Sequence, residues 1–343
     1  MEIKAIISQR HRQKLLWLLV LVTLTWQTAF AQSEREFLDV RYGERRAELT
    51  EADADQDRLL DIRLPQSEQP SQGYPVIMFI HGGGFSSGDK GMQGGVRGMF
   101  QAFMNKGYAI VSINYRLLRK RSTQNVVANG MRRVSRRAGE EGTDRTFSAD
   151  INAATDEAAV DATLALEWLN ANGADYGLDL SRLFLWGGSA GSITALYAAF
   201  VTAPSQPAIR AIINCWGGIR DTSLIQKDIP VLTIHGDQDE TVNVKYGRAV
   251  QERMEQLGST LSRIIIMEGL GHAQYKYVGE TLMPDIFLFL DDVLSTTNDE
   301  TSVIPLRVNA HKSTSSYSLH GYPSAGNHGV CIEDGKKHIM RKL

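Results

Sequence analysis

The feature that most constrains the fold is the regular alternation of apolar runs and helical patterns between residues 75 and 295. The apolar runs are PVIMFI, YAIVSINYRL, RLFLWG, AIRAIINCW, PVLTIHG and SRIIIMEG. They are continuous, as expected of strands that are buried on both faces of a mostly parallel sheet. Helical patterns such as DEAAVDATLALEWLNANG separate them, with alanine and leucine recurring at helical spacing. This order predicts an α/β fold with a mostly parallel, doubly wound sheet flanked by helices.

The N-terminal segment is typical of an export signal. Basic residues precede the apolar run LLWLLVLVTL, which leads to Ala29-Phe30-Ala31, a small-x-small cleavage pattern. The run is too short for a stable membrane span. We therefore expect a signal peptide over residues 1–31, export to the periplasm or the medium, and no membrane attachment after cleavage.

The remaining segments complete the expected domain organisation. Two short alternating segments, EFLDVRYGE and RLLDIRLP, predict a pair of strands at the start of the α/β domain, which covers residues 32–296, with no large lid domain. Residues 117–148 form a basic insertion, which we interpret as solvated surface; a flap that attracts an anionic substrate is the alternative. Residues 297–343 are interpreted as a linker and a short β-like tail.

Three glycines follow the first apolar run in the stretch HGGGF, residues 81–85. Glycines directly after a buried strand indicate that the backbone itself approaches a ligand. A phosphate cradle would need Lys-Ser or Lys-Thr after the loop, or the Rossmann glycine spacing, and neither is present. The other candidate is a developing oxyanion, which the backbone amides of Gly83 and Gly84 could stabilise.

A second glycine-rich stretch, GGSAG, joins a predicted strand to a predicted helix at Ser189. At such a junction the G-x-S-x-G pattern predicts a strained turn that exposes a nucleophilic serine above the sheet. The amide of Ala190, at the start of the helix, would add a donor and the helix dipole to the oxyanion hole. Because a hydroxyl is a weak nucleophile, a base and an orienting acid are also required.

On this fold an acid and then a histidine follow the serine along the chain. His272 lies in a glycine-rich loop after the last predicted strand and is the expected base. The acids that precede it are Asp237, Asp239 and Glu240. Their spacing alone does not choose between them. His235 and His81 lie in or at the end of predicted strands and are interpreted as structural.

Together these stretches resemble the α/β-hydrolase carboxylesterases, in the hormone-sensitive-lipase-like or feruloyl and acetyl esterase-like group. The matching stretches are HGGGF, NYRL, DATLALEWLNANGADYGLDLSRLFLWGGSAG, HGDQDETV and GHA. The resemblance implies a Ser189, Asp239 and His272 triad, because the H-G-x-x-D-x-x-V pattern puts the acid on Asp239, with Asp237 as the fallback. It also implies hydrolysis of short-chain acyl or aromatic esters, including acetyl and feruloyl esters of plant polysaccharides, without a cofactor. The chain departs from the family in having Ser192 where a second glycine is frequent.

Other patterns limit the alternatives. The formal net charge of −2 gives no reason to expect a nucleic-acid partner. No cluster of histidine, cysteine and carboxylate residues has metal-ligand spacing. Phe85 and Trp216 are the candidates for contact with an ester substrate, whether a small molecule or linked to a polysaccharide. Alternative functions are a serine peptidase or amidase, including an arylformamidase-like enzyme, and a non-catalytic binding protein on a hydrolase scaffold.

Overall fold

The computed structural model describes residues 35–45, 56–91, 94–118, 146–202, 204, 206–301, 329–333 and 336–340. The predicted signal peptide and most of the basic insertion lie outside these residues. The chain divides into two compact units, Met1–Thr297 and Asn298–Leu343. The sheet and the predicted site belong to the first unit.

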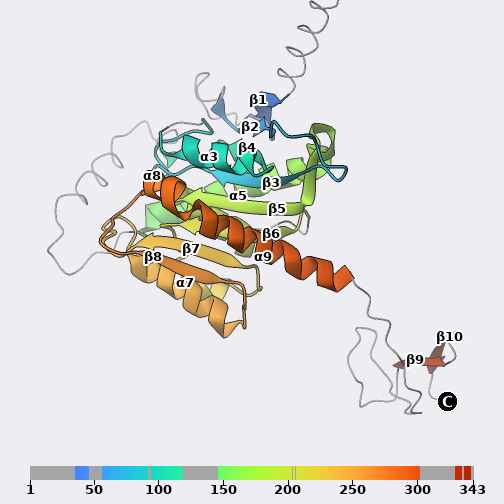
Figure 1. Ribbon diagram of the computed structural model, residues 1–343. Helices are drawn as coiled ribbons and strands as arrows, with labels where there is room; N and C mark the ends of the chain where they lie inside the picture. Colours follow the sequence, from blue (N-terminus) through green and yellow to red (C-terminus); the bar gives the residue numbers. More distant parts are fainter. Residues whose placement is uncertain are drawn as a thin grey trace, which may run out of the picture. The chain divides into compact units, whose positions relative to one another are not determined.

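An eight-stranded sheet with the strand order β1-β2-β4-β3-β5-β6-β7-β8 forms the centre of the first unit (Figure 1). Its strands are β1 (Glu36–Arg41), β2 (Leu59–Arg63), β3 (Tyr74–Ile80), β4 (Ala109–Ile113), β5 (Leu178–Gly188), β6 (Ile209–Cys215), β7 (Val231–Gly236) and β8 (Arg263–Met267). Strand β2 pairs antiparallel with β1 and with β4, and the other neighbours pair in parallel. The predicted mostly parallel sheet, preceded by a pair of strands, is therefore confirmed.

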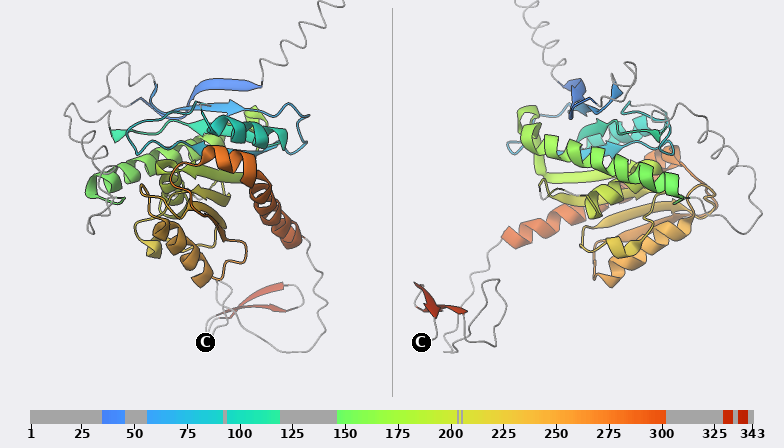
Figure 2. Two further views of the ribbon diagram at one scale, coloured as in Figure 1. Left: turned by 60° about the vertical axis from the view of Figure 1, so that its left-hand side comes forward. Right: turned by 180° about the vertical axis from the view of Figure 1, so that it is seen from behind.

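Helices cover both faces of this sheet. The helical segments are α3 (Val96–Asn105), α5 (Ala149–Asn172), η2 (Gly173–Tyr176), α6 (Ala190–Phe200), η3 (Thr222–Leu224), α7 (Val244–Gln256), α8 (Tyr275–Tyr277), η4 (Val278–Leu282) and α9 (Met283–Thr301). Helices α3 and α9 lie on the near face in Figure 1, and α5 and α7 cross the opposite face in the right-hand view of Figure 2. Side chains of α5, α6 and α7 join one hydrophobic core, and those of α3, η4 and α9 join the other.

Strand β3 shows why its sequence is continuously apolar. Val76, Met78 and Ile80 point into the core beneath α5 and α6, whereas Ile77 and Phe79 point into the core beneath α3 and α9. Because successive side chains of a strand face opposite sides, a strand between two helical layers is apolar on both of its faces, as β3 is. The carboxyl end of this strand leads directly into the glycine-rich loop.

The first unit ends at Thr297, next to the predicted end of the domain at residue 296, although the last helix continues further. Helix α9 continues to Thr301, beyond the expected start of the linker at residue 297. No glycine or proline follows Leu294 before Pro305, so the polar residues there carry no strong stop signal. In the second unit, β9 (Gly329–Glu333) and β10 (Lys336–Met340) pair as an antiparallel hairpin.

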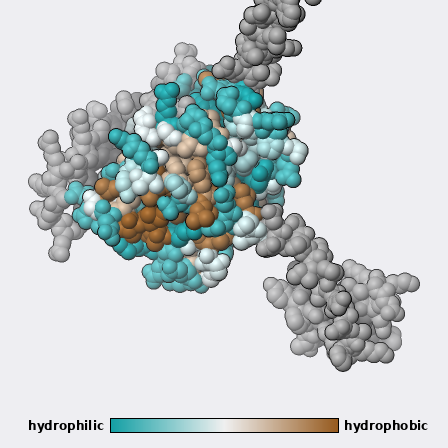
Figure 3. Space-filling view, viewed as in Figure 1, coloured by the Kyte–Doolittle hydropathy of each residue, from teal (hydrophilic) through white to brown (hydrophobic). Residues whose placement is uncertain are grey.

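The surface of the first unit is mostly polar. In the view of Figure 3, apolar side chains gather over the β7–β8 end of the sheet, where β8 is the edge strand and only Met267 of its residues is fully buried. Within the described ranges, no helix has the length and apolar character needed to cross a membrane.

Candidate active site

Ser189 lies in a tight turn between the end of β5 and the start of α6. Its backbone adopts φ 56° and ψ −124°, a conformation that costs energy for a residue with a side chain. The turn is held on one side by a hydrogen bond from the Ser189 amide to the Cys215 carbonyl oxygen, at 2.9 Å. On the other side, a Cβ at position 191 would lie 1.9 Å from the carbonyl oxygen of Ile80, so only glycine fits. The structure thus contains the strained turn that the sequence predicted.

Ser192, the departure from the family pattern, braces this turn. Its hydroxyl donates a 2.6 Å hydrogen bond to the Gly187 carbonyl oxygen and accepts one of 2.8 Å from the Cys215 amide. The side chain is completely buried. The serine therefore ties the turn to strand β6, a role that glycine could not perform.

The turn brings Ser189 next to His272, which lies 83 residues later in the sequence. Ser189 Oγ is 2.8 Å from His272 Nε2, and His272 Nδ1 is 2.7 Å from Asp239 Oδ2. Because a carboxylate can only accept a hydrogen bond, Nδ1 carries the proton and Nε2 is left to accept from the serine hydroxyl. This is the tautomer that a general base needs.

Asp239 is held for this task by its surroundings. Its Oδ1 atom accepts hydrogen bonds from the amides of Thr241, at 2.8 Å, and Val242, at 2.9 Å. His235, completely buried, places its Nε2 atom 3.3 Å from Oδ2. Burial alone would raise the pKa of Asp239, but hydrogen bonds from His235 and His272 outweigh it and hold the pKa well below its ordinary value. Asp239 is therefore ionised throughout the neutral range.

The structure also separates Asp239 from the two neighbouring acids. Asp237 turns its Oδ1 atom to the Gly269 amide, at 2.7 Å, and thereby holds the loop that leads to the histidine. Glu240 is exposed. Only Asp239 among the three contacts His272. His235 was predicted to be structural, but the sequence did not indicate that it touches the acid.

The glycine-rich loop after β3 lies against Ser189. Gly83 and Gly84 have φ of 114° and 59°, in the left-handed region that favours glycine. A turn fixes the loop, because the amides of Ser86 and Ser87 both donate to the Gly83 carbonyl oxygen at 3.1 Å. Within the part of the chain that the structure describes, the amides of Gly83, Gly84 and Ala190 have no hydrogen-bond acceptor. These amides are the predicted oxyanion hole, and that role remains a prediction.

His81 braces this loop from below, as predicted. Its ring stacks on Tyr115 with a centroid distance of 4.3 Å, and its Nδ1 atom lies 2.7 Å from the Gly82 carbonyl oxygen. The Tyr115 hydroxyl donates to the His81 carbonyl oxygen at 2.8 Å. Burial lowers the pKa of His81 to about 4, so the imidazole is neutral at neutral pH.

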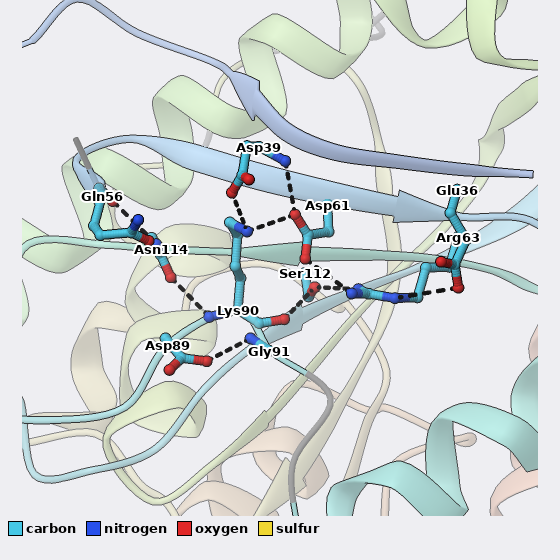
Figure 4. A network of polar contacts seen from close by, with 10 residues as sticks. All are labelled: Glu36, Asp39, Gln56, Asp61, Arg63, Asp89, Lys90, Gly91, Ser112 and Asn114. Atoms are coloured by element: carbon cyan, nitrogen blue, oxygen red, sulfur yellow. Dashed lines mark hydrogen bonds and ion pairs between the residues drawn. The ribbon is translucent and has the colours of Figure 1, made fainter. Parts of the chain in front are cut away.

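A buried polar network holds the far end of the same loop (Figure 4). Lys90 Nζ contacts Asp61 Oδ1 at 2.6 Å and Asp39 Oδ1 at 2.7 Å. Its amide donates to Asn114 Oδ1 at 2.7 Å, and its carbonyl oxygen accepts from the Ser112 hydroxyl at 2.7 Å. Burial alone would lower the pKa of Lys90, but its bonds to both aspartates raise it above its ordinary value. The loop is therefore anchored to β1, β2 and β4, which no sequence motif predicted.

The two candidates for substrate contact are both buried. Phe85 is 1% exposed and packs near Tyr115, whereas Trp216 is completely buried. The Trp216 ring meets Tyr275 edge-to-face at 4.8 Å and lies 6.3 Å from the His272 ring. Their contact with substrate stays a prediction; in the structure they support the loops of the site. The described residues contain no group of histidine, cysteine and carboxylate side chains arranged to hold a metal ion.

Comparisons with known proteins agree with this architecture. A family model described as BD-FAE matches residues 60–129, which include the glycine-rich loop. Esterase B from Lactobacillus rhamnosis is 16% identical, with a TM-score of 0.54, over 82% of this chain and 98% of that chain. A truncated carbohydrate esterase from gut microbiota is 16% identical, with a TM-score of 0.51, over 78% of this chain and 96% of that chain. Esterase 2 from Thermogutta terrifontis, phosphorylated by paraoxon, is 17% identical, with a TM-score of 0.50, over 74% of this chain and 93% of that chain.

The chain therefore has the α/β-hydrolase fold, as the resemblance implied. Its first part is more narrowly similar to the BD-FAE family, from β2 through the glycine-rich loop and into the basic insertion, as far as residue 129.

Proposed function

We propose that this protein is a serine carboxylic ester hydrolase that works through an acyl-enzyme intermediate. The observation that carries the proposal is the continuous pair of hydrogen bonds from Ser189 to His272, at 2.8 Å, and from His272 to Asp239, at 2.7 Å. Nucleophile, base and orienting acid are thus in contact, with the base in the required tautomer.

In the first half of the proposed reaction, Ser189 Oγ attacks the ester carbonyl carbon while its proton passes to His272 Nε2. The ionised Asp239 stabilises the imidazolium that forms. The carbonyl oxygen becomes an oxyanion beside the free amides of the glycine-rich loop and of Ala190. The bond to the alcohol then breaks, and the leaving oxygen takes the proton from Nε2.

In the second half, water takes the place of the alcohol. His272 removes a proton from the water as its oxygen attacks the acyl carbon. Collapse of the second tetrahedral intermediate breaks the bond to Ser189 Oγ, which recovers its proton, and the carboxylic acid leaves. The cycle needs no cofactor or metal.

The proposed substrates are short-chain acyl or aromatic esters, such as acetyl and feruloyl esters on plant polysaccharides. Support comes from the family model over residues 60–129 and from the carbohydrate esterase among the similar structures. Export through the N-terminal segment would bring the protein to such polymers. Intact-mass analysis of the secreted chain tests the proposed export, because cleavage after Ala31 leaves Gln32 as the first residue.

Initial rates on p-nitrophenyl acetate, butyrate and octanoate and on methyl ferulate test the activity. The full chain is compared with Ser189→Ala and with Ser223→Ala, an exposed serine outside the site. Turnover by the full chain and by Ser223→Ala, abolished in Ser189→Ala, supports the proposal, and the preferred ester defines the acyl pocket. A folded protein that is silent on all four esters contradicts it and favours a peptidase or a binding scaffold.

A further inference from the structure

Tyr275 is an aromatic residue next to the site that no sequence pattern singled out. It begins α8, three residues after His272. Its ring packs edge-to-face on Trp216, with a centroid distance of 4.8 Å and an interplanar angle of 88°. Trp216 is completely buried and lies beside His272. The phenol therefore has a fixed position relative to the proposed base.

The Tyr275 hydroxyl fills a space that exists only because residue 188 is glycine. A Cβ at Gly188 would lie 2.0 Å from Tyr275 Oη and 2.7 Å from Cζ. Gly188 is the residue directly before the nucleophile, the variable position of the G-x-S-x-G pattern. Any side chain there would displace the phenol, so the glycine at position 188 and the tyrosine at position 275 form one arrangement.

The same hydroxyl lies at the start of the glycine-rich loop. A Cβ placed on Gly82 would be 3.5 Å from Tyr275 Oη and also 3.5 Å from Ser189 Cβ. The hydroxyl and the nucleophile thus flank one point, immediately before Gly83. Gly82 directly precedes Gly83 and Gly84, whose amides are proposed to bind the oxyanion.

The hydroxyl is able to donate a hydrogen bond. The Trp216 indole N–H lies near it but does not reach normal hydrogen-bond geometry, and no other described residue hydrogen-bonds to it. Burial raises the pKa of Tyr275 well above its ordinary value. The group therefore remains a protonated donor at neutral pH, with its proton available to a ligand.

We propose that Tyr275 is a further catalytic residue, whose hydroxyl donates a hydrogen bond to the carbonyl oxygen of the bound ester as that oxygen becomes an oxyanion. The inference rests on the proposed ester hydrolysis. A phenol fixed by packing costs little reorganisation when charge develops, as preorganised stabilisation requires. It would add a side-chain donor to the backbone amides of the proposed oxyanion hole.

Tyr275→Phe tests this role, because it removes the hydroxyl and keeps the ring on Trp216. The matched control is Tyr277→Phe, two residues away and 39% exposed. On p-nitrophenyl acetate we expect Tyr275→Phe to lower kcat by at least about tenfold with KM within about twofold, since loss of one such donor costs about 10²–10³ elsewhere. A trifluoromethyl ketone, which forms a hemiketal oxyanion on serine, should bind more weakly by a similar factor. Tyr277→Phe should match the unmodified protein in all three values.

Unchanged kcat in Tyr275→Phe would overturn the inference and leave the residue as a wall of the pocket. A rise in KM alone would overturn it equally, because that pattern describes uniform binding. Thermal melting of both variants checks the fold. If Tyr275→Phe melts at a lower temperature, the affinity for the trifluoromethyl ketone relative to that of the unmodified protein still tests the oxyanion role. If the unmodified chain and Tyr277→Phe are themselves inactive, the proposed function fails first, and the oxyanion role fails with it.

Discussion

The substitution Asp239→Asn would reverse the hydrogen bond that orients His272. Two backbone amides donate to Asp239 Oδ1, so the carbonyl oxygen of the new amide would remain there. Its NH₂ group would then take the place of Oδ2, the atom that lies 2.7 Å from His272 Nδ1 in the unmodified protein, and would face that nitrogen. Two donors cannot share this contact, so the imidazole would carry its proton on Nε2. In that tautomer it cannot accept the proton of Ser189.

The expected loss in kcat is about 10³–10⁴-fold, or about 4–5.5 kcal/mol of activation free energy. This magnitude combines the wrong tautomer with the loss of a carboxylate that is in direct contact with the imidazolium. KM should change little, because Asp239 is buried and does not meet the substrate. Initial rates on p-nitrophenyl acetate at neutral pH, with the protein quantified by its absorbance and its fold checked by circular dichroism, measure both constants.

Asp237→Asn is the matched control. Asp237 lies two residues away but bonds to the Gly269 amide, and we expect this variant to keep kcat within about threefold. The reasoning is refuted if Asp239→Asn keeps more than about a tenth of kcat, or if Asp237→Asn loses as much.

Three further predictions concern stability. Ser192→Ala strands a buried amide and should lower the free energy of unfolding by about 1–3 kcal/mol in urea, whereas no change would contradict the bracing role. Because burial lowers the pKa of His81 to about 4, the unfolded chain, with an ordinary histidine pKa of about 6.5, binds a proton that the folded chain does not. His81 therefore makes the free energy of unfolding fall as the pH drops from about 6.5 to about 4, by at most about 1.4 kcal/mol per unit, and guanidinium unfolding of His81→Gln at pH 7 and pH 5 should show a flatter dependence. Lys90→Met removes one charged hydrogen bond from the buried Asp61, which keeps Arg63 Nη2 at 2.9 Å, and should cost about 1.5–3 kcal/mol. Asp39→Asn, at an exposed carboxylate, should cost less than about 1 kcal/mol. Equal losses of unfolding free energy in urea for the two variants would contradict the prediction that the buried contact to Asp61 contributes more than the exposed contact to Asp39.

Much of the fold could be predicted from local patterns. Continuous apolar runs marked the strands of the parallel sheet, because a strand covered on both faces needs apolar side chains at most of its positions. The glycines around Ser189 marked its turn, because backbone atoms approach too closely there for any other residue. The ends of elements were less predictable: α5 begins at Ala149, ahead of the first strongly periodic residues, and α9 extends to Thr301.

The acid that orients His272 could not be predicted from local sequence patterns alone. Order along the chain predicted His272, but residue spacing left three acids open, and only the family pattern favoured Asp239. The structure distinguishes Asp239 from Asp237 by the direction of the side chain, which depends on the turn after β7. No local signal marks such a direction.

By itself, the sequence determined the sheet, the strained serine turn and the glycine-rich loop, because each follows from the conformational needs of a few adjacent residues. The tertiary structure decided which acid orients the histidine, that Ser192 braces the turn, that Lys90 anchors the loop, and that the Tyr275 hydroxyl lies beside Ser189. These contacts join segments that are distant along the chain. They exist only where the crossovers of the sheet bring the ends of its strands together, and their geometry depends on packing that no single stretch of sequence encodes.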